Sequence, residues 1–331
     1  MTYQSGSLGK IQAGDINSFL STNSPNLNGL WSTGSGNSGY GQPPVATVAV
    51  ADKIKATTWN NLIDHITKMA AHQGTSILSM TNTLAPTLPA TSAQIRIIAD
   101  NVNTRITNNL SSINTNRLNS AATPRSTSST TVTHSTTWSN ALTATFTVSF
   151  ASDNAARYFF NAGGQIGIQA SHPNSTNINR LLSEICSNIG TIWMSSPVSG
   201  TASIDGGTYH GIEQLGSSGT GSSVSINTNY GFYNWTTSST AIITQYGNYS
   251  YPGSSGGNYN TSTFGRISVQ YNGTGSITIT FLLDEVPNGA IAAANTQVTL
   301  IFKPPSTTYL SNSWGSVAAG TITIGSSISA S

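Results

Sequence analysis

The stretch Leu142-Thr-Ala-Thr-Phe-Thr-Val-Ser-Phe150 alternates apolar side chains with Thr and Ser along its whole length. A period of two places the apolar side chains on one face of a β-strand and the hydroxyl-bearing ones on the other. Similar alternation recurs at residues 267–271, 277–281, 298–302 and 322–324, with turn signals at Asn272-Gly273 and Asn288-Gly289. We therefore predict that residues 136–331 form a mainly antiparallel β-sandwich or barrel-like domain.

One segment of this β-rich region has helical spacing. Between residues 177 and 193 the apolar side chains recur every three or four positions, which places them along one side of a helix. We expect this helix to pack across the sheet, with Cys186 as a small buried side chain on its apolar side. The apolar series consists of Ile178, Leu181, Leu182, Ile185, Ile189 and Trp193.

Residues 1–120 are predicted to be helical. Apolar side chains follow the helical period in two series, at Trp59, Leu62, Ile63, Ile66 and Met69, and at Ile95, Ile98, Val102, Ile106, Leu110 and Ile113. The second series forms a narrow stripe on a helix rich in Asn and Thr, which have low helix propensity. That helix needs a partner, either the Trp59 helix or the same helix of another subunit.

A short internal repeat relates residues 11–20 to residues 54–63 within this region. Asp15 and Thr58 occupy positions where we predict helix N-caps, and Gly74 is the predicted stop of the second helix. Residues 121–135 are rich in Thr and Ser, contain Pro124, and are interpreted as a linker. The predicted class is therefore a two-domain α+β protein, with a small helical domain over residues 1–120 followed by the β-rich domain.

The composition excludes several functions. Only 7% of the residues are charged and the net charge is +2, so no basic surface for nucleic acid is expected. No apolar run reaches 18 residues, so no membrane-inserted helix is expected, and the first residues do not resemble a signal peptide. The single cysteine excludes a disulfide framework or a thiolate-rich metal site.

Candidate catalytic groups are sparse. The five histidines lack metal-binding spacing, and the string Gly253-Ser-Ser-Gly-Gly257 has flanks that suit neither the strand nor the helix of a nucleophile elbow. We predict no catalytic residue, no metal and no cofactor. Because the β-rich region contains several carboxylates, a surface-polysaccharide depolymerase stays open as an alternative, with Glu213 and Asp205 as the acidic pair to test.

Aromatic residues are concentrated between residues 230 and 259, among Gly, Asn and Ser. Rigid amphipathic rings beside adaptable polar groups are typical of binding loops. One interpretation is a glycan-recognition surface for a host envelope, and the other is packing between hairpins or across a subunit interface. The candidate glycan-binding residues are Tyr230, Tyr233, Trp235, Tyr249 and Tyr251.

Several strings resemble structural virion proteins of tailed bacteriophages, cyanophages among them. The N-terminal strings are Ile11-x-Ala13-x-Asp15-x-Asn17, Gly39-Tyr-Gly-Gln42, Ile54-x-Ala56-x-x-Trp59-x-x-Leu62 and His72-Gln-Gly74, and residues 153–164 resemble a string found further along such proteins. The resemblance implies a virion component, a fibre-like or appendage protein of the tail, neck or baseplate. It carries over no functional residue.

The expected function is therefore that of a non-enzymatic virion protein, assembled in the host cytoplasm. Residues 1–120 would dock on other virion proteins, and the β-rich domain would project outward in a homo-oligomer. A trimer is expected by analogy with fibres. A capsid decoration protein is a further alternative.

The string around Arg157 is the predicted site of contact between subunits. Arg157 precedes Tyr158, Phe159 and Phe160, which together present more apolar surface than one strand face can bury. We predict that the three rings pack against both the sheet core and a neighbouring subunit. Arg157 would then pair with Asp153 or with a carboxylate of the neighbour.

Overall fold

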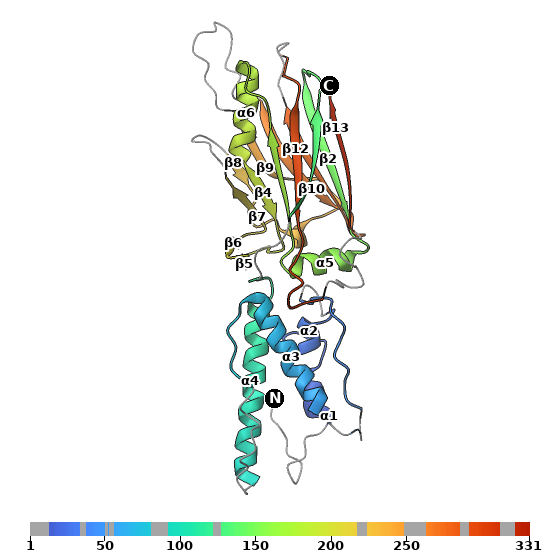
Figure 1. Ribbon diagram of the computed structural model, residues 1–331, viewed down its shortest axis with the longest axis vertical. Helices are drawn as coiled ribbons and strands as arrows, with labels where there is room; N and C mark the ends of the chain where they lie inside the picture. Colours follow the sequence, from blue (N-terminus) through green and yellow to red (C-terminus); the bar gives the residue numbers. More distant parts are fainter. Residues whose placement is uncertain are drawn as a thin grey trace. The chain divides into compact units, whose positions relative to one another are not determined.

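In a computed structural model, the chain folds into two compact units (Figure 1). The helical unit comprises residues 1–123, 203–206 and 306–316, and the sandwich unit comprises residues 124–202, 207–305 and 317–331. The predicted α+β class is confirmed. The structure describes residues 13–33, 38–49, 52, 56–80, 92–121, 127–216, 224–247, 263–284, 291–311 and 322–331.

The helical unit contains α1 (Ala13–Phe19), α2 (Leu27–Leu30), α3 (Ala56–Gln73) and α4 (Ser92–Thr115). The two copies of the internal repeat begin α1 and α3 at the corresponding residues Ala13 and Ala56. Asp15 and Thr58 therefore lie inside the first turn, and their prediction as N-caps is wrong. At this position the Asp15 carboxylate still faces the positive end of the helix dipole.

α3 and α4 pack together and provide much of the helical core. α3 ends before Gly74, whose φ of 70° is the left-handed conformation that favours glycine, so the predicted stop is confirmed. The buried Gln73 amide donates to the Ile113 carbonyl at 3.1 Å and to the Tyr40 hydroxyl at 2.6 Å. The fully buried apolar side chains of the two helices are Leu62, Ile66, Met69, Ile106, Leu110 and Ile113.

Two late segments complete the helical unit. The Ser120 amide donates to the Ser203 carbonyl at 2.7 Å, and the Asp205 amide donates to the Ser120 carbonyl at 2.9 Å. Further along, the Gln42 side-chain oxygen accepts from the Ser311 amide at 3.0 Å and from its hydroxyl at 2.5 Å. The unit is therefore not one continuous N-terminal stretch.

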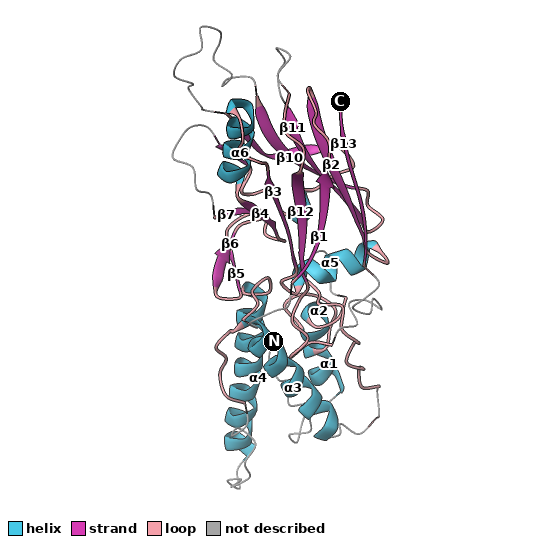
Figure 2. Ribbon diagram, turned by 45° about the horizontal axis from the view of Figure 1, so that its top comes forward, coloured by secondary structure: helices cyan, strands magenta, loops and turns pink. Residues whose placement is uncertain are grey.

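Two antiparallel sheets form the sandwich unit (Figure 2). The five-stranded sheet has the order β1 (Ser128–His134), β12 (Thr296–Lys303), β3 (Gln165–Ser171), β4 (Thr191–Met194) and β7 (Ile212–Leu215). The six-stranded sheet has the order β13 (Thr323–Ala330), β2 (Ala141–Ser149), β11 (Ser276–Asp284), β10 (Phe264–Tyr271), β9 (Thr240–Tyr246) and β8 (Val224–Ile226). β5 (Ala202–Ile204) and β6 (Gly207–Tyr209) form a separate two-stranded ribbon.

β1 overturns the interpretation of residues 121–135 as a linker. All seven residues of β1 pair with β12, from Ser128 opposite Phe302 to His134 opposite Thr296. Thr is β-branched and suits an exposed strand. Because this edge strand buries little surface, its sequence lacks the apolar alternation of a core strand and therefore resembles a linker.

The core lies between the two sheets. The inward-facing side chains of β2 and β11 are entirely buried, as the strict alternation of their sequences predicts. α6 (Asn177–Ile189) packs on β3 of one sheet and on β9 and β10 of the other. A Cβ at Gly265 would lie only 2.6 Å from Ile185 Cγ2, so the absent side chain lets this helix approach the strand.

The predicted helix over residues 177–193 is shorter in the structure. Gly190, with a φ of 63°, ends α6, and Trp193 lies in β4. Cys186 is buried as predicted, and burial raises the pKa of its thiol to about 12. No helix in the described ranges is long and apolar enough to cross a membrane.

Candidate functional site

The predicted subunit-interface residues lie in a helix, α5 (Asp153–Asn161). The Ser152 hydroxyl caps this helix by accepting from the Ala155 amide at 3.1 Å. Tyr158, Phe159 and Phe160 are 1%, 1% and 0% exposed within the single chain. The rings therefore have no surface left for a neighbouring subunit, and that part of the prediction is wrong. A helix can bury all three consecutive rings because its successive side chains point to different parts of the core, whereas those of a strand alternate between two faces.

The polar groups of α5 also bond within the chain. Arg157 Nη2 donates to the Tyr158 hydroxyl at 2.8 Å, and the guanidinium carbon lies 4.6 Å from the centre of the Tyr158 ring. The Asp153 carboxylate accepts a hydrogen bond from the Tyr271 hydroxyl. Burial, followed by the interaction with Asp153, raises the pKa of Tyr271 above its usual range. The Asp153–Tyr271 bond joins α5 to β10 of its own sandwich unit, whereas the Arg157–Tyr158 contacts lie within the helix.

An aromatic cluster surrounds α5. Phe160 stacks on Phe232 with ring centres 4.5 Å apart, and Phe159 stacks on Phe302 at 4.9 Å. Aromatic pairs with such geometry stabilise a fold beyond the burial of their area. The cluster, which we name the α5 cluster, consists of Phe150, Phe159, Phe160, Phe232, Trp235, Tyr271 and Phe302.

Three predicted glycan-binding residues belong to this packing. Trp235 is 6% exposed and donates from Nε1 to the Tyr230 carbonyl at 2.8 Å. The Tyr233 hydroxyl donates to Asn161 Oδ1 at 2.6 Å, and the Tyr230 hydroxyl donates to Thr240 Oγ1 at 3.0 Å. Trp235 is too buried to stack on a sugar, which corrects its assignment. Tyr249 and Tyr251 lie outside the described residues.

A hydroxyl, an imidazole and an amide form a chain that resembles the partners of a catalytic triad. His172 Nδ1 lies 2.8 Å from Thr296 Oγ1, and its Nε2 lies 2.9 Å from Asn179 Oδ1. Trp138 Nε1 approaches Thr296 Oγ1 at 3.3 Å. Thr296 is entirely buried and His172 is 6% exposed, so a substrate cannot reach the hydroxyl. The chain is a buried hydrogen-bond network that joins α6 to the five-stranded sheet.

The carboxylates of the depolymerase alternative do not form a site within one unit. Asp205 belongs to the helical unit, where its φ of 51° makes it part of a tight turn. Glu213 belongs to the sandwich unit and accepts from the His210 amide at 3.2 Å. In the ranges that the structure describes, no three His, Cys, Asp or Glu side chains gather as metal ligands.

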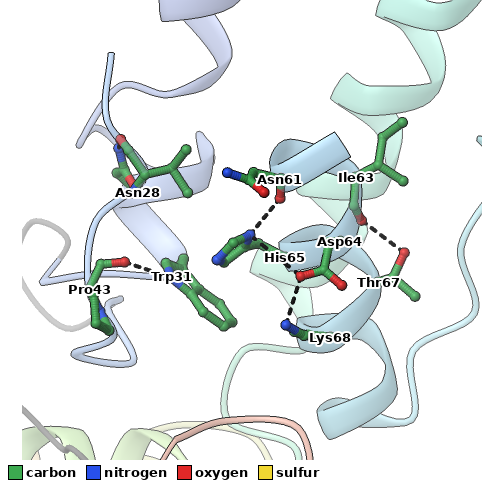
Figure 3. Close-up of polar contacts among 10 residues, drawn as sticks. Asn28, Trp31, Pro43, Asn61, Ile63, Asp64, His65, Thr67 and Lys68 are labelled. Atoms are coloured by element: carbon green, nitrogen blue, oxygen red, sulfur yellow. Dashed lines mark hydrogen bonds and ion pairs between the residues drawn. The ribbon is translucent and has the colours of Figure 1, made fainter. Parts of the chain in front are cut away.

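The exposed side of α3 carries a local polar network (Figure 3). The His65 ring packs edge-on against Trp31 with centres 4.2 Å apart, and its Nδ1 lies 2.5 Å from the Asn61 carbonyl oxygen. Asp64 and Lys68 form an ion pair of 2.7 Å one helical turn apart. His72, seven residues after His65, is fully buried beside Tyr40. The two histidines therefore have separate packing roles.

One side of the sandwich is open. β1 and β13 end their respective sheets and contact each other, whereas α6 covers the region of β3, β9 and β10. On β13, the positions that face inward opposite Phe146 and Val148 are the exposed Ser326 and the half-buried Ile324. On β1, Val132 is only half-buried although its partner Val298 is fully buried. The apolar interior thus reaches solvent along these two strands, which we name the open side.

No protein-family model, no curated protein and no solved structure matches the chain. Function is therefore inferred from the surfaces of the described residues and from the sequence resemblance.

Proposed function

We propose that the chain is a non-enzymatic structural component of a tailed-phage virion, and that it assembles as a homo-oligomer. The virion placement is supported by the N-terminal strings and by residues 153–164. A fibre-like position in the tail, neck or baseplate, with three copies, remains our expectation. The observation that carries the assembly part of the proposal is the open side of the sandwich.

Among the described residues, we find none of the features that keep edge strands apart on the open side. Monomeric β-proteins protect their edges with Lys, Pro, bulges or covering segments. β1 and β13 contain no Asp, Glu, Lys, Arg or Pro, and their pairing with β12 and β2 is regular. No described strand pairs with their outer edges, so their outer backbone groups and the half-buried Val132, Ile324 and Ile328 would meet a second copy. Because neither strand carries a charge at pH 7 with His134 neutral, like-charge repulsion does not oppose self-association.

The mass of the full-length chain in solution tests this proposal. A monomer has a mass of 34.4 kDa, so light scattering after gel filtration should give a multiple of that value for the natural chain. The substitution Ile328→Lys places a charge at an inward position of the open side and should give a folded monomer. Ser329→Lys is the matched control, because it adds the same charge to the outward face of the same strand.

A natural chain that stays at 34.4 kDa at micromolar concentrations would contradict the homo-oligomer. If both lysine variants lost assembly equally, the inward side chains of the open side would not be the interface. The virion part is tested separately, by imaging labelled chain on purified phage particles. Label on the tail, neck or baseplate supports the proposal, label over the head favours a capsid decoration protein, and unlabelled particles would overturn the virion assignment.

A further inference from the structure

The outer face of the six-stranded sheet carries two aromatic side chains that the α5 cluster does not use. Tyr246 on β9 and Phe264 on β10 are directly opposite each other, and their ring centres are 5.7 Å apart. Tyr246 is 40% exposed, the highest exposure of any described tyrosine in the sandwich unit. The neighbouring Gly265 is buried against α6, so Phe264 and Arg266 lie on the opposite, outer face of the sheet, where both are half-buried.

Charged groups flank these rings. The Arg266 guanidinium carbon lies 4.6 Å from the centre of the Phe264 ring, in a cation–π contact. Asp284 on β11 is opposite Phe264, and Thr244 on β9 is opposite Arg266. Among the described residues, neither Arg266 nor Asp284 forms an ion pair. Four side chains around Phe264 therefore lie on one face: the Tyr246 ring, the Arg266 guanidinium with its hydrogen-bond donors, the Asp284 carboxylate and the Thr244 hydroxyl.

We propose that Tyr246, Phe264, Arg266 and Asp284 form a binding platform for the pyranose ring of a polysaccharide. Strands are about 4.8 Å apart and alternate residues about 7 Å apart, so the platform spans about 10 Å by 7 Å, the scale of one hexose unit. The exposed Tyr246 ring offers an apolar face to the C–H groups of the sugar. Arg266 donates to sugar oxygens, and Asp284 accepts from hydroxyl groups.

The surroundings favour a sugar over a protein or a nucleic acid. Apart from Leu282, which is opposite Arg266, the outer face of β10 and β11 beyond the platform carries half-buried hydroxyl and amide side chains, including Thr278, Thr280, Ser268 and Gln270. A stable protein interface needs a much larger apolar centre than two rings. A nucleic acid needs several cations, whereas this part of the face has one arginine and also a carboxylate, Asp284, opposite the adjacent Phe264.

The platform goes beyond the proposed structural function and does not depend on it. It occupies β9, β10 and β11, whereas the open side is formed by β1 and β13, and β2 separates β11 from β13 in the sheet. Self-association through the open side would leave the platform accessible. A homo-oligomer would then carry one platform per copy, and weak single contacts would add as avidity.

An array of neutral hexose, N-acetylhexosamine and uronate oligosaccharides tests the platform with the full-length chain. We expect binding to at least one of these pyranose classes, followed by titration of that oligosaccharide in solution. Tyr246→Ala and Arg266→Gln should each weaken the Kd about tenfold, which corresponds to one stacking contact or one charged hydrogen bond. Tyr246→Phe keeps the ring and should stay within about threefold of the natural chain.

Tyr309→Ala is the matched control, because Tyr309 has the same 40% exposure but belongs to the helical unit. It should leave the Kd unchanged. A larger effect of Arg266→Gln on uronates than on neutral sugars would identify an acidic glycan, and equal effects would identify a neutral one. The platform is overturned if no oligosaccharide on the array binds, or if binding survives both Tyr246→Ala and Arg266→Gln. Neither result affects the mass measurement, which tests the proposed function independently.

Discussion

The buried imidazole of His172 has a defined proton arrangement. The Asn179 amide nitrogen faces two hydroxyls, at 2.9 and 2.7 Å, which assigns its oxygen to the side of His172. Nε2 must therefore carry a proton and donate to Asn179, so Nδ1 accepts from the Thr296 hydroxyl. Thr296 in turn accepts from Trp138. The network satisfies a neutral histidine. A second ring proton, on Nδ1, would force Thr296 Oγ1 to accept in place of donating, and the Thr296 hydroxyl hydrogen would lose His172 as its acceptor.

The folded protein should consequently lose stability as the pH falls below about 6.5, the ordinary histidine pKa. Burial lowers the pKa of His172, although the hydrogen bond with Asn179 opposes this effect. The unfolded chain then binds the proton more tightly than the folded one, so stability is complete above about 6.5 and decreases as the pH falls from there. Thermal unfolding at pH 5 to 8 measures this, and His172→Gln should flatten the dependence. An unchanged slope in that variant would assign the effect to other groups.

At the scale of elements, sequence periodicity predicted those strands and helices that bury one face in the core. The inward residues of β2, β11 and β12 alternate strictly because one face of each strand is buried, and the helical period of α3 and α4 has the same cause. α5 was missed because Tyr158, Phe159 and Phe160 are all buried, so no polar position reveals a period. β1 was missed for the opposite reason, since its face is largely exposed. The sugar-binding candidates followed from local aromatic density, which does not distinguish Trp235 inside the core from Tyr246 outside it.

Truncation of Phe160 tests α5 as a structural anchor. Its ring is fully buried and stacks on Phe232, so Phe160→Ala should lower the free energy of unfolding by about 3–5 kcal/mol. Tyr246→Ala, which removes an exposed ring from the same unit, should change it by less than about 1 kcal/mol. Urea denaturation of both variants compares the two effects. Similar losses in both would mean that the α5 cluster contributes little more than a surface ring.

At the scale of the whole molecule, the two units are interleaved along the chain. The sequence predicted a boundary near residue 120 because the apolar period changes there, and the first unit in the structure runs to residue 123. It gave no sign that residues 203–206 and 306–316 return to the helical unit, because single hydrogen bonds such as those of Gln42 leave no periodic signal. The low charge suits both units, since a buried unpaired charge is costly in closely packed interiors.

The return of residue 311 to the helical unit makes its stability depend on the far end of the chain. Gln42 is 2% exposed, and its side-chain oxygen accepts both the Ser311 amide and hydroxyl. Gln42→Ala leaves these donors without that acceptor, which should cost about 1–3 kcal/mol. Hydrogen exchange should therefore accelerate in peptides covering residues 38–49 and 305–311, while β2 and β11 keep their protection. Gln270→Ala is the matched control, because it removes a side-chain hydrogen bond to the Thr237 carbonyl inside the sandwich unit. Faster exchange across both units in Gln42→Ala would instead show that they unfold as one cooperative structure.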